Sequence, residues 1–180
     1  NSVAVNRAAE VAKTMSLTTE FHVDDLFNFK PNQRYDFLIS IGVLMCTNDC
    51  MKAIKSVIQN CLTEKGKIYI GLYHLHGRKP FLNYFKNLQS KGYSNDELLK
   101  EYSKIHTSLK DKTHLESWFR DQVLHPHETL HTMEEIMPIL ESENMILTST
   151  SINKFEKIDY VKNKGYDKTQ LQSIFEKEKK

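Results

Sequence analysis

The sequence predicts an α/β fold, in which an open, mostly parallel sheet has flanking helices and a helical cap is inserted after one of its strands. Residues 35–44 and 67–73 are almost continuously apolar, which is typical of strands buried on both faces of a parallel sheet. Residues 49–62 between them show apolar positions at helical spacing, so the three segments make a βαβ unit. Residues 75–130 then hold helical patterns and no good strand, which predicts the cap.

Local signals predict the elements around this unit. Residues 1–17 have apolar positions at helical spacing and predict a helix capped by Ser2. Residues 20–23 predict a short strand, and residues 27–34 predict a loop because they are polar and contain a proline. A lysine-glycine turn over residues 64–66 is expected to separate the central helix from the second strand of the unit.

Three helices are predicted in the cap, near residues 81–89, 95–106 and 114–123. Two of them begin at capping boxes, in which a hydroxyl side chain and a carboxylate three residues later each bond the other's backbone N–H. The two boxes pair Ser94 with Glu97 and Thr113 with Glu116. A helical insertion of this length after a strand is typical of a lid or a substrate-binding cap.

The remainder of the chain returns to the sheet. Residues 132–140 predict a helix that starts at a third capping box, formed by Thr132 and Glu135. Residues 145–152 predict a strand, and residues 168–178 predict a last helix whose mixed lysines and glutamates indicate a solvated end. The chain thus divides into a partial core (1–74), a helical cap (75–130), a return to the core (131–152) and a polar C-terminal tail (153–180).

Composition and charge argue against several classes of protein. Hydrophobic residues make up 39% and charged residues 27%, which is typical of a globular domain. The formal net charge of +2 provides no dense basic footprint, so no nucleic-acid partner is expected. No apolar run approaches the ~20 residues of a membrane span, and no signal peptide is visible. The three cysteines form no paired framework, so we expect a reducing compartment, the cytoplasm.

Residues 35–78 carry an ordered set of short motifs. An aromatic-aspartate pair opens a strand, an S-x-G-V-L-x-x-T run ends it, a lysine-glycine turn follows the helix, and Gly-Leu-Tyr closes the next strand. This set resembles the motif IV region of class I, Rossmann-like, S-adenosylmethionine-dependent methyltransferases. The pattern W-F-x-D…H-P-x-E-x-x-H-T over residues 118–132 is similar to one subgroup of that family. The resemblance extends over residues 1–152.

The resemblance implies a Rossmann-like sheet and the transfer of a methyl group from S-adenosylmethionine to a small-molecule acceptor. The family's first strands and its G-x-G-x-G cofactor loop are absent, since the six glycines nowhere form that pattern. We therefore expect roughly 40–80 further residues upstream, the size of one βαβ unit. Without them the chain is expected to fold poorly, because apolar strands are left at an open edge. Whether these residues are active alone is left open.

The resemblance also places the cofactor at the carboxyl ends of the strands, where α/β sheets bind ligands. Asp24 and Asp25 would accept hydrogen bonds from the adenine amino group, and the amide of Leu26 would lie beside them. Ile41 and Gly42 would bring backbone close to the sulfonium. Two alternatives stay open, namely that Asp25 only caps the next turn and that Gly42 marks a strand bulge.

Three residues at the junction of sheet and cap are the candidates for substrate chemistry. His125 is the natural general base, because histidine side chains titrate near neutral pH. Glu128 would orient that base or bind a substrate cation, and Tyr73 lies at the end of a predicted strand. The alternative is a polar network that pins the cap to the sheet.

Two other functions compete with methyl transfer. Residues 127–131, HETLH, match the H-E-x-x-H signature of zinc peptidases, which predicts a zinc-dependent hydrolase. That motif needs both histidines on one helix, whereas Pro126 and the N-cap at Thr132 predict a loop between them. The third hypothesis is a non-catalytic, methyltransferase-like binding module, which the missing glycine loop favours.

Overall fold

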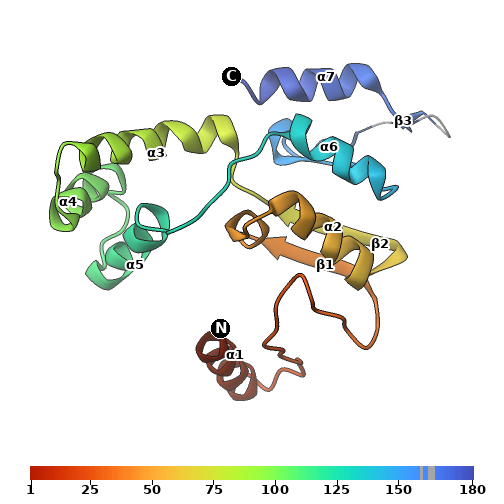
Figure 1. The fold of residues 1–180 in the computed structure, drawn as a ribbon, viewed down its shortest axis with the longest axis horizontal. Helices are drawn as coiled ribbons and strands as arrows, with labels where there is room; N and C mark the ends of the chain where they lie inside the picture. Colours follow the sequence, from red (N-terminus) through yellow and green to blue (C-terminus); the bar gives the residue numbers. More distant parts are fainter. Residues whose placement is uncertain (159, 162–164) are drawn as a thin grey trace.

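Two parallel strands and the helix that joins them lie at the centre of the molecule (Figure 1). The computed structural model describes residues 1–158, 160–161 and 165–180. The α-helices are α1 Ser2–Thr14, α2 Cys50–Cys61, α3 Leu75–Ser90, α4 Asn95–Ile105, α5 Lys112–Gln122, α6 Met133–Ser142 and α7 Lys168–Lys177. The strands are β1 Tyr35–Ile41, β2 Leu62–Gly71, β3 Tyr160–Val161 and β4 Gly165–Tyr166, and the 3-10 turns are η1 Leu44–Cys46 and η2 Ser151–Asn153. Residues 159 and 162–164 of the expected polar tail lie outside the described residues.

Strands β1 and β2 run parallel, and their register pairs Phe37 with Lys67. Helix α2 connects them, so the predicted βαβ order is confirmed. The turn predicted over residues 64–66 is wrong, because β2 already begins at Leu62, opposite Tyr35. Between the pairs Tyr35–Leu62 and Phe37–Lys67 the register shifts, because β2 has more residues than β1 over this stretch. The extra residues of β2 form an irregularity inside the strand. The chain is therefore α/β, with a parallel strand pair at its centre.

The main hydrophobic core lies on one face of this strand pair, beneath α2. The apolar face of α2 is buried, and Ile54 in its middle has no exposed surface. Met137 of α6 and Leu171 of α7 close the cluster from the other side. Full burial of one such side chain contributes about 1.5–3 kcal/mol, so this cluster provides much of the stability. The strand residues that pack against it are Leu38, Ile68 and Ile70.

The opposite face of the strand pair is open to solvent. Phe37, Ile39 and Ile41 are 59%, 60% and 63% exposed, and Tyr69 on the neighbouring strand is 45% exposed. Successive residues of a strand point to opposite faces, so β1 has a packed side at Leu38 and an open side at Ile39. The predicted burial of this strand on both faces is wrong for the described residues. None of the described residues covers the apolar outer side of β1.

Two predicted strands are wrong. Residues 20–23 lie in an irregular segment between α1 and β1, and residues 145–152 run as irregular chain into η2. Strand preference reflects packing and pairing with neighbours more than an intrinsic backbone preference, so apolar alternation alone does not decide it. Met145 and Leu147 nevertheless pack against the main core. The loop predicted over residues 27–34 is confirmed.

Helices α3, α4 and α5 follow β2 and lie to one side of the sheet, around a second core (Figure 1). Phe85, Leu98, Tyr102 and Phe119 are its buried residues. The predicted capping box of Ser94 and Glu97 is confirmed. The box predicted at Thr113 is wrong, because α5 starts earlier and Asp111 caps it, accepting a hydrogen bond from the His114 N–H at 2.7 Å. Aspartate is at least as strong an N-cap as threonine.

The other helix starts and ends also test the sequence signals. The capping box of Thr132 and Glu135 at α6 is confirmed. Helix α1 is capped by Asn1, whose side chain accepts from the Val3 N–H at 3.0 Å, and not by Ser2 as predicted. Helix α7 matches the predicted last helix, and Glu176 and the lysines at its end are exposed as predicted, whereas Glu178 is 4% exposed. Among the described residues, no helix combines the length and apolar character needed to cross a bilayer.

Candidate functional site

The segment that leaves the cap crosses the carboxyl ends of both central strands. Thr129 donates from its backbone N–H and its hydroxyl to the carbonyl of Met45, at 2.9 and 3.0 Å. The His131 N–H donates to the Tyr73 carbonyl at 3.0 Å, and the His131 carbonyl accepts from the Leu75 N–H at 3.0 Å. These bonds hold residues 123–132, which we call the crossing loop, at the edge of the sheet where α/β folds bind ligands.

A buried ion pair joins the crossing loop to the first turn of α3. Arg78 donates to both carboxylate oxygens of Glu128, from Nε at 3.1 Å and from Nη2 at 3.0 Å. Nη2 also donates to the Gln122 carbonyl at 2.8 Å. The guanidinium lies 4.5 Å from the ring centre of Tyr73 and 4.8 Å from that of Phe81. A bidentate, stacked arginine is a strong and directional contact, so Glu128 is firmly oriented.

This arrangement bears directly on the expected role of Glu128. Its side chain is 9% exposed and that of Arg78 is 10% exposed, so the pair is nearly closed to water. For Glu128 to orient a base or bind a substrate cation, it would have to give up a bond to Arg78. The alternative, a polar network that pins the cap to the sheet, describes the contacts directly. Arg78 was missed as a site residue, although its place just beyond the Gly-Leu-Tyr strand end offered a signal.

Burial, with the charges around the pair, raises the pKa values of Tyr73 and Cys46. Burial raises the pKa of Tyr73, the Arg78 guanidinium lowers it, and the negative charges of Asp121 and Glu128 raise it again, with a net rise. Burial and the same two carboxylates raise the pKa of the Cys46 thiol. At neutral pH, Tyr73 is therefore a hydrogen-bond donor and not a base.

Two histidines of the crossing loop have one ring nitrogen engaged. The backbone N–H of His127 donates to Nδ1 of His125 at 3.3 Å, which assigns the ring proton of neutral His125 to Nε2. The Nε2 of His127 lies 3.0 Å from the carbonyl of Thr47 and donates to it. In its neutral form His125 thus presents a donor at Nε2.

The zinc-peptidase pattern does not form its helix. Residues 127–131 are loop, so His127 and His131 do not share one helix face. The two rings are engaged elsewhere, since His131 contacts the Thr129 hydroxyl at 2.8 Å and Glu135 at 3.5 Å. No group of three or more histidine, cysteine or acidic side chains in the described part of the chain could hold a metal ion. The geometry of a zinc-dependent hydrolase is therefore absent from this motif.

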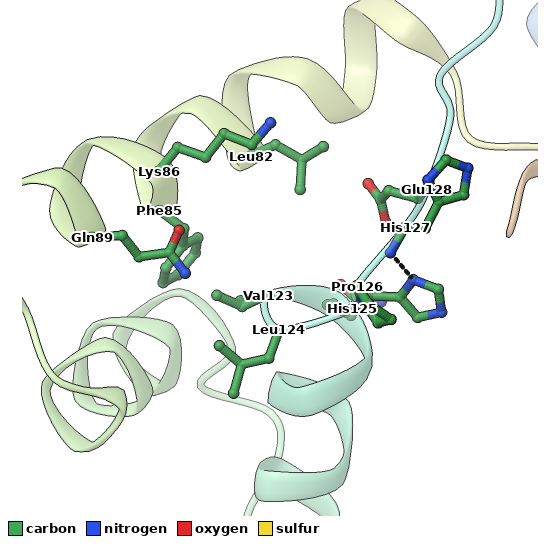
Figure 2. Close-up of a pocket in the computed structure, with 11 residues that line it drawn as sticks. Leu82, Phe85, Lys86, Gln89, Val123, Leu124, His125, Pro126, His127 and Glu128 are labelled. Carbon is green, nitrogen blue, oxygen red and sulfur yellow. Dashed lines mark hydrogen bonds between the residues drawn. The ribbon is translucent and has the colours of Figure 1, made fainter. Parts of the chain in front are cut away.

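A pocket of about 370 Å³ lies between α3 and the crossing loop (Figure 2). Its volume is in the range of pockets for small molecules. The α3 wall presents Leu82, Phe85, Lys86 and Gln89, one face of the helix, and the loop wall includes His125 and Glu128. Two of the three predicted substrate residues therefore line one pocket. The third, Tyr73, is not among the residues that line the pocket, and it stacks on the Arg78 guanidinium that pairs with Glu128.

The predicted adenine-binding residues form a local turn. One carboxylate oxygen of Asp25 accepts from the Phe27 N–H at 2.9 Å, and the other accepts from the Asn28 side chain at 3.1 Å. Asp24 accepts from the Asp25 N–H at 2.8 Å. Asp25 therefore caps the turn that follows it, which is the alternative to adenine binding given in the sequence analysis. Leu26 is partly buried against the main core, which holds this loop to the body of the molecule.

Gly42 leaves open backbone at the end of β1. Its φ of 71° is in the left-handed region that favours glycine, and a Cβ placed there would meet no atom within 4 Å. Ile41 beside it is exposed. No hydrogen bond or ion pair within the described ranges joins this point to the Asp25 turn. Gly42 thus fits a close approach by a ligand, whereas Asp25 already has two hydrogen-bond partners.

A second contact missed in the sequence lies behind the crossing loop. Glu178 at the end of α7 accepts from the Met133 N–H at 2.8 Å and pairs with Nε2 of His74 at 3.3 Å. His74 in turn caps α3 by accepting from the Gly77 N–H. The last helix therefore ties together the starts of α3 and α6, the two helices on either side of the site.

Comparison with known proteins adds no family to these observations. No protein-family model matches the chain, and no curated protein matches it. The functional argument therefore rests on the contacts described above.

Proposed function

We propose that the chain is part of an S-adenosylmethionine-dependent methyltransferase that acts on a small-molecule acceptor. The crossing loop supports this most, because Thr129 and His131 hold it across the carboxyl ends of two parallel strands, while its residues His125 and Glu128 line the pocket. That edge is where open α/β sheets bind cofactors and substrates. The pocket beside it has room for a small acceptor, and the backbone of Gly42 lies open at the same edge.

The residues present fit one part of the cofactor. S-adenosylmethionine supplies an activated methyl group when bound. Ile41 and Gly42 would hold it through backbone, and the free space over Gly42 supports that role. Asp24, Asp25 and Leu26 would hold the adenine, for which each Asp25 oxygen would have to accept a second hydrogen bond. A carboxylate has lone pairs for this.

The chain's own residues would mainly bind and orient the acceptor. The Arg78–Glu128 pair fixes the crossing loop, and the α3 wall of the pocket excludes water from one side of the acceptor. Tyr73 and the Nε2–H of His125 would donate hydrogen bonds. Positioning is the main task of a methyltransferase, because the methyl donor is reactive by itself.

The bare face of β1 and β2 supports a larger fold around this unit. Ile39 and Tyr69 are exposed on it, whereas a mostly parallel sheet is normally covered on both faces. We propose that further segments of a Rossmann-like fold cover this face and provide the remaining cofactor contacts.

Calorimetric titration with S-adenosylmethionine tests the proposal. It is carried out on the 180-residue chain and on the chain with any residues that precede Asn1 in its gene. Binding by either form, weakened by Gly42→Ala, is the expected result. Gly92→Ala is a matched control, since Gly92 also has a positive φ and open space but lies in the α3–α4 turn. If neither form binds, methyl transfer is overturned and the binding-module hypothesis takes its place.

A further inference from the structure

The pocket between α3 and the crossing loop is lined by both apolar and polar side chains. Figure 2 shows the two walls facing each other, with α3 on one side and the loop on the other. Its apolar residues include Leu82, Phe85, Val123 and Leu124. Amide groups come from Gln89 and Gln122. Such a lining takes a molecule with an apolar body and a small number of polar atoms.

The pocket carries one uncompensated charge, and that charge is positive. Lys86 of α3 lines it, and no acidic side chain in the described part of the chain lies within ion-pair distance of its Nζ. Among the described residues of the lining, the only carboxylate is that of Glu128, whose charge is balanced by Arg78. A cationic ligand would meet repulsion from Lys86, whereas an anionic group would give it a partner.

The side chains around the pocket offer little for removing a proton. Glu128 has both oxygens on Arg78, and Tyr73 remains protonated. The Nδ1 of His125 accepts a backbone N–H. His127 also lines the pocket, and its Nε2 is engaged with the Thr47 carbonyl. An acceptor that must lose a proton would lack a base here, whereas one that is already an anion needs none.

We infer that the methyl acceptor is a small carboxylic acid, whose apolar body fills this pocket and whose carboxylate lies against Lys86. The inference rests on the proposed function. In the transfer, a carboxylate oxygen forms a bond to the methyl carbon, the carbon–sulfur bond of the sulfonium donor breaks, and its electron pair stays on sulfur. A methyl ester and a neutral thioether result, and no proton moves.

Three probes of matched shape test the charge preference by nuclear magnetic resonance of the ¹⁵N-labelled chain. They are benzoate, the neutral benzamide and the cationic benzylamine. Benzoate is expected to shift the amide signals of residues 82–89 and 122–128 and to bind most tightly. Lys86→Gln should weaken benzoate roughly tenfold, the loss of one charge-assisted contact. Lys91→Gln at the end of α3 is the control and should change nothing.

The outcomes separate this inference from the proposed function. Equal affinity for the three probes, or benzoate binding unchanged in Lys86→Gln, overturns the carboxylate acceptor even if S-adenosylmethionine binds. Lys86-dependent binding of benzoate supports the anion site, even in a preparation that fails to bind S-adenosylmethionine. In that case the proposed methyl transfer is overturned, whereas the proposed carboxylate-binding site is supported.

Discussion

The guanidinium of Arg78 holds together parts of the chain that are far apart in the sequence. It stacks on Tyr73 at the end of the second central strand and reaches Gln122 and Glu128 across the cap. Together with the backbone bonds of Thr129 and His131, this side chain holds the cap against the sheet. The sequence identified Glu128 and Tyr73 as members of a polar cluster, but not the arginine between them. Arg78 and Glu128 are fifty residues apart, and pairing over such a separation leaves no local pattern.

Arg78→Gln is expected to destabilise the protein more than Glu128→Gln. Removal of the arginine leaves the carboxylate of Glu128 buried and unpaired, which costs roughly 3–5 kcal/mol. Glu128→Gln removes the carboxylate charge, but Arg78 keeps its hydrogen bond to the Gln122 carbonyl and its contacts with two aromatic rings, so the loss of stability is smaller. Urea unfolding of both variants and of the double variant gives the coupling free energy. A loss below about 1 kcal/mol for Arg78→Gln would show that the pair is open to water.

At the scale of single elements, helices were easier to predict than strands. Helix caps are local, so Ser94 and Thr132 could be recognised from the residues that follow them. A strand depends on its neighbours, which explains why residues 20–23 and 145–152 resembled strands and are irregular. The failure at Thr113 has another cause, because Asp111 is an equally good cap two residues earlier.

Alanine substitutions at the helix caps test this distinction. Ser94→Ala removes a side chain that accepts from the Glu97 N–H, and it should cost about 1 kcal/mol of unfolding free energy. Thr113→Ala should change stability by less than about 0.5 kcal/mol, because Thr113 is exposed and lies inside α5. Thermal and urea unfolding measure both. A larger effect at Thr113 than at Ser94 would restore the helix start that the sequence suggested.

At the scale of the whole molecule, the two faces of the central strand pair differ in kind. One face is packed under α2, and the other exposes apolar side chains on a strand with an open edge. Exposed apolar edge strands promote association between chains. The sequence predicted apolar strands correctly but could not say which face is covered, since an almost continuous apolar run assigns both sides to the core.

Ile39→Thr and Leu38→Thr form a matched pair on neighbouring positions of β1. Ile39 is 60% exposed, so its substitution should change stability by less than about 0.5 kcal/mol and should reduce self-association. Leu38 packs against the main core, and its substitution should cost about 2 kcal/mol or more. Sedimentation velocity and thermal melting measure the two effects. A sharp, cooperative melt of a strictly monomeric wild-type chain would contradict the idea that the bare face drives association.

The bond that places the crossing loop at position 131 has a consequence for how this sequence can drift over generations. At that position the backbone N–H donates to the Tyr73 carbonyl, and the backbone carbonyl accepts from the Leu75 N–H. Every amino acid except proline provides both, so the backbone bonds alone exclude only proline, whereas the His131 side chain is 12% exposed and contacts the Thr129 hydroxyl and Glu135. In a library of residue 131 variants we expect proline to be the least tolerated residue and polar residues close to histidine in size to be the best tolerated.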